Sequence, residues 1–124
     1  MKKLITSLSL ALISIHASAT LANADLESAN KVYNQAVSLV GEGKKMEALR
    51  GSTNVDENLQ CSQTMKSNMQ KARILKTQAD ALAVSHFQLK LAAIELHSCV
   101  TCATDALESC SRADDALNEF SRNN

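Results

Sequence analysis

Residues 75–96 read LKTQADALAVSHFQLKLAAIEL, a stretch in which leucine occupies every seventh position. The same step continues outward to Cys61 on one side and to Cys110 and Leu117 on the other. A second row, at positions 65, 72, 79, 86, 93, 100 and 107, holds Met, Ala, Ala, His, Ala, Val and Leu. Two rows spaced in this way are typical of the a and d positions of a helical seam with a period of about 3.5 residues. The pattern predicts helix over most of the chain from residue 54 onward.

Two arrangements satisfy this repeat. One is a single helix of roughly 60 residues, about 90 Å long; the other is an antiparallel hairpin whose two arms share one apolar face. Helices much longer than about 25 residues are uncommon in small domains, which favours the hairpin. We expect the turn at Val84, Ser85 and His86, because Val84 and Ser85 are weak helix formers and Ser85 forms a capping-box pair with Gln88. His86 is then expected at a helix start or buried in the core.

The composition of the 124-residue chain favours an all-α fold. The chain has no proline and no tryptophan, and its aromatic residues are Tyr33, Phe87 and Phe120. Strand-rich domains depend on aromatic and β-branched residues and on Gly/Pro turns. All three glycines lie within 41–51, and none interrupts the chain beyond. We therefore predict a small helical bundle in which a short N-terminal helix packs on a long antiparallel helical hairpin, stapled by disulfides.

The first 24 residues have the layout of a bacterial secretory signal peptide. A short basic start is followed by a mostly apolar run over 4–15 and by two small-x-small sites, at 17–19 and 22–24. The apolar run is well short of the about 20 residues that a membrane span needs. We therefore expect export, with a periplasmic or secreted location.

We expect cleavage after Ala24, with Ala19 as the alternative, which leaves residues 25–124 as a single helical domain. Lys2 and Lys3 leave with the leader, so 11 basic residues then face 13 acidic ones, a formal charge of −2. This charge argues against nucleic acid and against an anionic membrane surface as partners. The mature part contains no further apolar stretch long enough for a membrane span.

The N-terminal helix is predicted over residues 25–40, where apolar residues recur at steps of three and four. Gly41 and Gly43 are expected to end it, and residues 44–50 to add a short helix. Asn54 is predicted to cap the start of the next helix, because an Asx side chain satisfies the free amides of a first turn.

All four cysteines lie in the mature part, where an oxidising compartment favours disulfides. In a hairpin centred between residues 85 and 86, Cys61 lies opposite Cys110, and we predict that these two are bridged. In a continuous helix, Cys110 lies about 16 Å from Cys99 and about 12 Å from Cys102. A disulfide needs Cα atoms within about 7 Å, so the second predicted bridge is Cys99–Cys102.

Other pairings become open only if the second arm of the hairpin breaks. The sequence offers one place for such a break, near Thr104 or Asp105, because Asp105 with Glu108 is a second capping pair. With a break there, Cys61 pairs with Cys99 or Cys102, and Cys110 with the other.

The pair Cys99 and Cys102 is also the one chemically suggestive motif. Haem attachment requires histidine directly after the second cysteine, and position 103 is alanine. A thioredoxin-like centre requires a preceding strand. A zinc site requires four ligands, and His97 points away from Cys99 on a helix. A two-thiolate site for a soft ion such as Cu(I) is left, so thiol redox chemistry or soft-metal handling by Cys99 and Cys102 is the alternative hypothesis for the function.

The sequence shows no catalytic constellation, since it has no Gly-rich phosphate loop, no HExxH motif and no facing pair of carboxylates. We therefore expect no enzyme and no cofactor. The leading hypothesis is a small exported helical protein that acts by binding another protein, as an accessory, chaperone-like, inhibitor or immunity-type factor. Its protein partner is unknown, and a homodimer forms if the apolar face exceeds what one domain buries.

Overall fold

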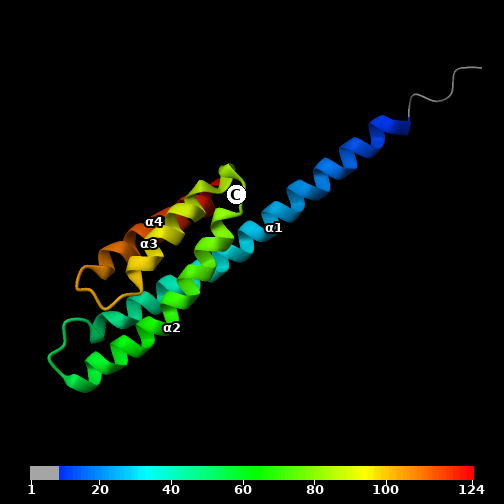
Figure 1. The fold of residues 1–124 in the computed structure, drawn as a ribbon. Helices are drawn as coiled ribbons and strands as arrows, with labels where there is room; N and C mark the ends of the chain where they lie inside the picture. The colour runs from blue at the N-terminus through cyan, green and yellow to red at the C-terminus, as the bar shows by residue number, and fades with distance from the viewer. Residues whose placement is uncertain (1–8) are drawn as a thin grey trace, which may run out of the picture.

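The computed structural model describes residues 9–124, with side chains from Thr20 onward. The helices are α1 (Ser9–Lys45), α2 (Val55–Asp80), α3 (Phe87–Cys99) and α4 (Ala106–Asn123), with short 3-10 segments at Met46–Leu49 and Val84–His86. Figure 1 shows successive helices running in alternating directions, with the start of α1 extending beyond the bundle. Helix α3 packs against α1, α2 and α4. The predicted all-α bundle with disulfide staples is confirmed.

The turn between α2 and α3 lies where the helix signals place it. Helix α2 ends at Asp80, and the 3-10 segment Val84–His86 leads into α3. His86 is buried, and its Nε2 lies 2.7 Å from Asp25 Oδ2 on α1. The Asp25 carboxylate also accepts a hydrogen bond from the backbone N–H of Ala83, at 3.4 Å. The segment that begins at Asp25 is thus fastened to the turn. The predicted break is confirmed, but the predicted capping pair of Ser85 with Gln88 does not form, because no side chain caps the start of the 3-10 segment or of α3.

The start of α2 is also as predicted. Asn54 Oδ1 accepts hydrogen bonds from the amides of Asp56 and Glu57, at 2.8 and 3.3 Å, so it caps the helix. Glu57 accepts a hydrogen bond from the hydroxyl of Ser52 rather than from the amide of Asn54. The cap therefore consists of one side chain and not of a reciprocal pair.

The second arm of the predicted hairpin is not one helix. Helix α3 ends at Cys99, the chain turns through residues 100–105, and α4 runs back alongside α3. Thr101 supports the turn, because its hydroxyl donates to the carbonyl of Ser98 at 2.8 Å and accepts from the amide of Ala103 at 3.4 Å. The long hairpin is therefore three helices, and the prediction of two arms is corrected.

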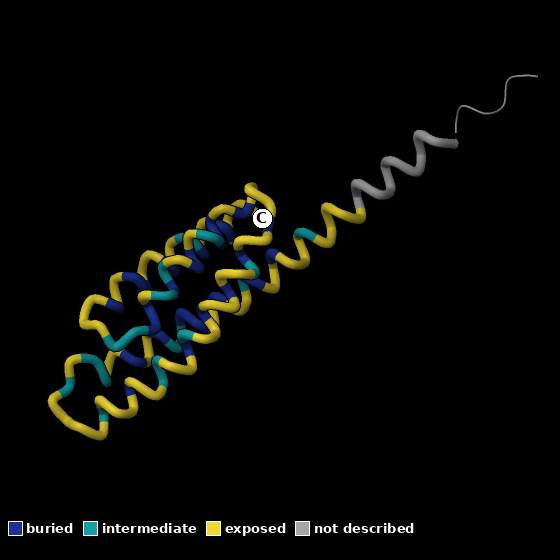
Figure 2. The backbone as a smooth tube through the Cα atoms, viewed as in Figure 1, coloured by how far each residue is buried: buried dark blue, intermediate teal, exposed yellow. Residues whose placement is uncertain are grey.

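Both apolar rows of the sequence face the core in spite of this second break. The leucines at 75, 82, 89, 96 and 117 are all buried, and so are His86, Ala93 and Val100 of the second row. Figure 2 shows buried positions on the inward side of each helix. The exposed members are Ala103, in the turn, and Leu107, in the first turn of α4. The period therefore predicts the core, even though it does not reveal the break.

The two glycines of α1 do not end the helix, which continues to Lys45. Gly43 is buried against the Cys99–Cys110 disulfide, where a Cβ atom would overlap Cys99 Sγ and lie 3.0 Å from Cys110 Sγ. A Cβ at Gly41 would meet nothing within 4 Å. The prediction of a helix end is therefore wrong, because Gly43 serves close approach of α1 to the disulfide rather than termination.

These two glycines give a matched pair for measuring that approach. We expect Gly43→Ala to lower the free energy of unfolding by about 1–3 kcal/mol, as overpacking of a core does. Gly41→Ala should raise it by about 0.5–1 kcal/mol, because alanine is the better helix former in open space. Urea unfolding of the disulfide-bonded protein measures both, and equal effects of the two changes would contradict the packing.

Candidate functional site

The four cysteines gather at the end of the bundle that holds the α1–α2 and α3–α4 connections. Cys61 is bonded to Cys102, with Cα atoms 6.0 Å apart, and Cys99 to Cys110, with Cα atoms 4.6 Å apart. The predicted bridges Cys61–Cys110 and Cys99–Cys102 are therefore wrong, and the observed pairs are among those expected if the second arm breaks near Asp105. The predicted bridges assumed a continuous second arm, whereas the turn after Cys99 brings Cys110 back to it and carries Cys102 across to α2.

This pairing changes what the Cys99 and Cys102 motif can do. Their sulfurs belong to two different disulfides, and Cys99 is fully buried while Cys102 is half-buried. In the part of the chain that the structure describes, no cysteine is free and no group of three or more His, Cys, Asp or Glu residues is placed to hold a metal. A two-thiolate site at this motif therefore requires that both disulfides first be reduced.

Arg50 links the two connections at this end, and nothing in the sequence distinguishes it. Its side chain is 2% exposed. The guanidinium donates from Nε to the carbonyl of Thr101 at 3.0 Å, and from Nη2 to the carbonyls of Gly43 and Cys99 at 2.8 and 2.6 Å. Its Nη1 pairs with Glu47 at 2.9 Å. A planar cation with several donors thus satisfies carbonyls at the ends of α1 and α3 that the helices leave free.

The outer side of α3 is the strongest candidate for a functional surface. The buried side of this helix carries Leu89, Ala92, Ala93 and Leu96, all inside the core. The opposite side carries Phe87, Leu91 and Ile94, which are 48%, 47% and 53% exposed.

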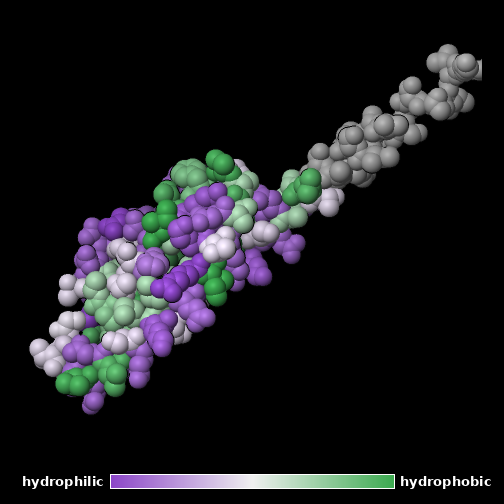
Figure 3. Space-filling view, viewed as in Figure 1, coloured by the Kyte–Doolittle hydropathy of each residue, from purple (hydrophilic) through white to green (hydrophobic). Residues whose placement is uncertain are grey.

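Val84, which is also exposed, precedes these three residues in the same succession of steps of three and four. We call Val84, Phe87, Leu91 and Ile94 the outer row. Figure 3 shows apolar atoms exposed over the turn from α2 into α3, where this row begins.

A helix that is apolar on both sides is normally covered on both sides. Helices α1 and α2 also expose large apolar side chains, which are Leu26 and Val37 on α1 and Val55, Leu59 and Ile74 on α2. These are spread along their helices, whereas α3 exposes three of them between Phe87 and Ile94. The outward side of α4 is mostly polar. An exposed row of large apolar side chains on one element typically marks a protein-binding surface. The outer row was missed in the sequence, because Leu91 and Ile94 lie outside the two heptad rows and simply add to an apolar stretch.

Charged side chains border the outer row. Lys90 reaches toward α2, with its Nζ 3.5 Å from the carbonyl of Asp80. Glu95 turns toward α4 and accepts from Arg112 Nε at 3.0 Å, a hydrogen bond that raises the pKa of Arg112. An open groove of about 710 Å³ runs beside Leu91 over α4, lined by Leu91, Asp115, Ala116, Asn118, Glu119, Ser121 and Arg122. The row therefore has charged edges of its own on the α2 and α4 sides.

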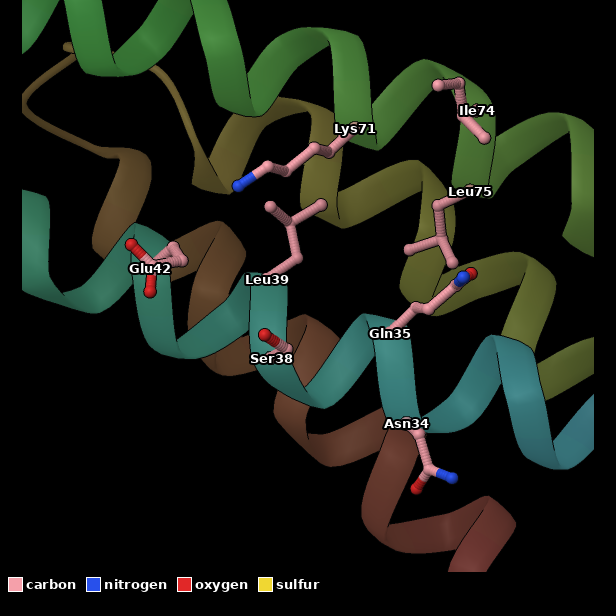
Figure 4. Close-up of a pocket in the computed structure, with 8 residues that line it drawn as sticks. All are labelled: Asn34, Gln35, Ser38, Leu39, Glu42, Lys71, Ile74 and Leu75. Atoms are coloured by element: carbon pink, nitrogen blue, oxygen red, sulfur yellow. The ribbon is translucent and has the colours of Figure 1, made fainter.

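A second groove, of about 530 Å³, lies between α1 and α2. In Figure 4, Lys71 extends from α2 over Leu39, Gln35 extends from α1 toward Leu75, and Ile74 lies on the α2 side of the groove. Leu39 and Leu75 form its floor and are themselves buried. Ile74 is the one exposed large apolar residue in its lining, whereas the outer row presents four, so the outer row is the better candidate.

No helix in the described part of the chain is both long enough and apolar enough to cross a membrane. Comparisons with protein-family models, with curated proteins and with solved structures give no match to this chain.

The disulfide pairing predicts a specific pattern of stability. Cys61→Ser and Cys102→Ser should each cost about 4 kcal/mol in the loop-entropy model, because their bridge spans 41 residues, and the double change should cost little more. The Cys99–Cys110 bridge spans 11 residues and should be worth about 3 kcal/mol. The losses of unfolding free energy caused by Cys61→Ser and Cys110→Ser should add in the double variant, because the two residues belong to different disulfides. Urea unfolding measures these losses, and non-reducing peptide mapping checks the bonds. A Cys61–Cys110 peptide would contradict them.

Proposed function

We propose that this protein is exported, loses residues 1–24, and acts by binding another protein through the outer row of α3. The observation that carries the proposal is that α3 is apolar on two opposite sides, of which the fold covers one. An accessory, chaperone-like, inhibitor or immunity-type factor works in this way, by presenting a rigid surface without a chemical step.

The contacts of α1 support cleavage after Ala24. Leu21 and Ala24 are exposed, whereas Asp25 bonds to the α2–α3 turn and Ala29 is fully buried. This part of α1 lies beyond the bundle in Figure 1. Removal of the first 24 residues would therefore take away no buried side chain among those that the structure describes. A helix segment without packing also unwinds easily, as a protease requires.

The state of the cysteines supports an oxidising location. All four form disulfides, which persist in the periplasm and outside the cell but are rare in the cytosol. A thin core built from many alanines gains a large share of its stability from such bonds.

The shape of the surface favours a protein as the partner. Small molecules bind in concave sites that cover most of their surface. The outer row is the convex side of a helix, and such a side is buried most readily by another helix or by a flat protein surface. The rigid bundle beneath the row keeps its side chains in place before binding, which lowers the entropic cost of association.

The N-terminus of the exported protein tests the first half of the proposal. Intact-mass measurement of protein from the periplasm or the medium should give a chain that begins at Asp25. Ala24→Lys should block this cleavage, because the enzyme accepts only small residues at the cleavage site. A chain that begins at Thr20 would move the site to Ala19, and a full-length chain in the cytosol would contradict export.

The second half is tested by capture from an extract of the same compartment with the tagged mature protein. We expect Leu91→Asp to reduce the captured partner by about tenfold or more, because the change buries an unpaired carboxylate in the interface. Leu59→Asp is the matched control, since Leu59 is an exposed leucine of α2 away from the row. Equal capture by both variants, with unchanged circular dichroism, would overturn the assignment of this surface.

A further inference from the structure

We propose that the protein bound by the outer row is a second copy of this chain, related to the first by a two-fold axis parallel to α3. The inference rests on the proposed function, because it names the partner of the same surface. It is carried by the spacing of the row and by the signs of the charges on its two edges.

The spacing of the row is that of a helix-pairing seam. With Leu91 at an a position, Phe87 and Ile94 fall at d positions of α3, and Val84 precedes them in the 3-10 segment that leads into the helix. Lys90 is then a g residue and Glu95 the next e residue, on opposite sides of the seam. In two parallel helices a g residue faces the following e residue of the partner. Lys90 of each copy therefore faces Glu95 of the other.

The edge formed by α2 is basic. Lys71 and Ile74 line the groove toward α1, so Arg73 and Lys76, on the other side of α2 at about 100° per residue, lie toward α3. Both are exposed. Lys90 reaches toward the same edge from α3. Lys76 is paired with Asp80 of the same helix at 2.6 Å, so three cations on this edge outnumber one carboxylate. We call Arg73, Lys76 and Lys90 the basic edge.

The edge formed by α4 is acidic. Asp115 and Glu119 line the groove that runs beside Leu91. Glu95 leans toward the same helix, where it accepts a hydrogen bond from Arg112. Arg122 lines the same groove, and Arg112 is paired with Glu95, so three carboxylates on this edge outnumber two guanidinium groups. We call Glu95, Asp115 and Glu119 the acidic edge. The outer row is therefore bordered by a basic edge on one side and an acidic edge on the other.

These signs select one symmetry. Two copies placed face to face have their two-fold axis in the plane of contact, either parallel or perpendicular to α3. A perpendicular axis places α2 against α2 and α4 against α4, so that like charges meet. A parallel axis places the basic edge of each copy against the acidic edge of the other. Since like charges at an interface are strongly unfavourable, the parallel arrangement is preferred.

The size of the surface sets the strength of the dimer. Helix α3 has 13 residues, so the seam is about two heptads long. A stable interface buries about 800 Å² on each partner, which four side chains of one helix do not supply. The α2 and α4 edges must therefore contribute, and dimerisation should weaken when salt screens their charges.

Sedimentation velocity of the mature protein, measured against concentration, tests the inference. We expect a monomer–dimer equilibrium that shifts toward monomer at high salt. Ile94→Asp should weaken the dimer by about tenfold or more, because it buries a carboxylate in the seam. Ile74→Asp is the matched control, since Ile74 is 54% exposed on the other side of the bundle, against 53% for Ile94. A wild-type protein that is monomeric at every concentration would overturn the proposal.

Exchange of the edge charges tests the symmetry. Arg73→Glu with Lys76→Glu makes both edges acidic and should weaken the dimer. Adding Asp115→Lys and Glu119→Lys restores opposite signs and should restore the dimer. With a perpendicular axis each edge meets its own copy, so reversing the charges of one edge still brings like charges together. The first set of changes would then not weaken the dimer and the second would not restore it, and this result would reject the parallel arrangement. Circular dichroism and non-reducing peptide mapping of each variant confirm that the bundle is intact.

The outcomes also separate this inference from the proposed function. A monomeric protein whose capture of an extract protein is lost in Leu91→Asp would exclude the second copy and leave the protein-binding surface in place. A monomeric protein whose capture is unaffected by Leu91→Asp would overturn both. A dimer weakened by Ile94→Asp but not by Ile74→Asp supports both.

Discussion

The disulfide end of the bundle depends on the hydrogen bonds of the Arg50 guanidinium. This group donates hydrogen bonds to the carbonyls of Cys99 and Thr101. Helix α3 can therefore end, and the chain can turn, without leaving buried acceptors unpaired. The same group holds the carbonyl of Gly43 and the carboxylate of Glu47. A buried cation without such partners would be strongly unfavourable, so these contacts form together. The turn that results places all four cysteines in bonding distance of their partners.

Much of the fold follows from local signals in the sequence. The period of the apolar rows predicts the helices and their buried sides, because apolar side chains that recur every three or four residues lie on one face of a helix, and that face packs into the core. The turn at His86 follows from weak helix formers beside a helix-start pattern, and the cap at Asn54 follows from its side-chain oxygen. Each of these features is decided within a few residues, which is why the sequence alone reveals it.

The features that the sequence did not reveal depend on contacts between distant segments. The break after Cys99 has no glycine or proline, and its one local signal is the Asp105 and Glu108 pair, which lies at the start of α4 but forms no side-chain cap. The donors that allow the break come from Arg50, on another connection. The seven-residue step also continues across the break, so the rows read as one arm. The wrong disulfide pairs follow directly from that reading. Gly43 shows the same limit, because its role is set by the Cys99–Cys110 bridge and not by its helix.

The two ends of the bundle are held together by different contacts, and neither set of contacts involves the outer side of α3. One end has the disulfides and Arg50; the other has the Asp25–His86 pair and the ring of Phe120 packed on Tyr33, with centroids 5.5 Å apart. Between them the core is made largely of alanine and leucine. None of these contacts uses the outer row, in which Phe87, Leu91 and Ile94 are about half exposed. The exposed part of such side chains favours aggregation unless a partner covers it, which is the physical reason to assign them to binding.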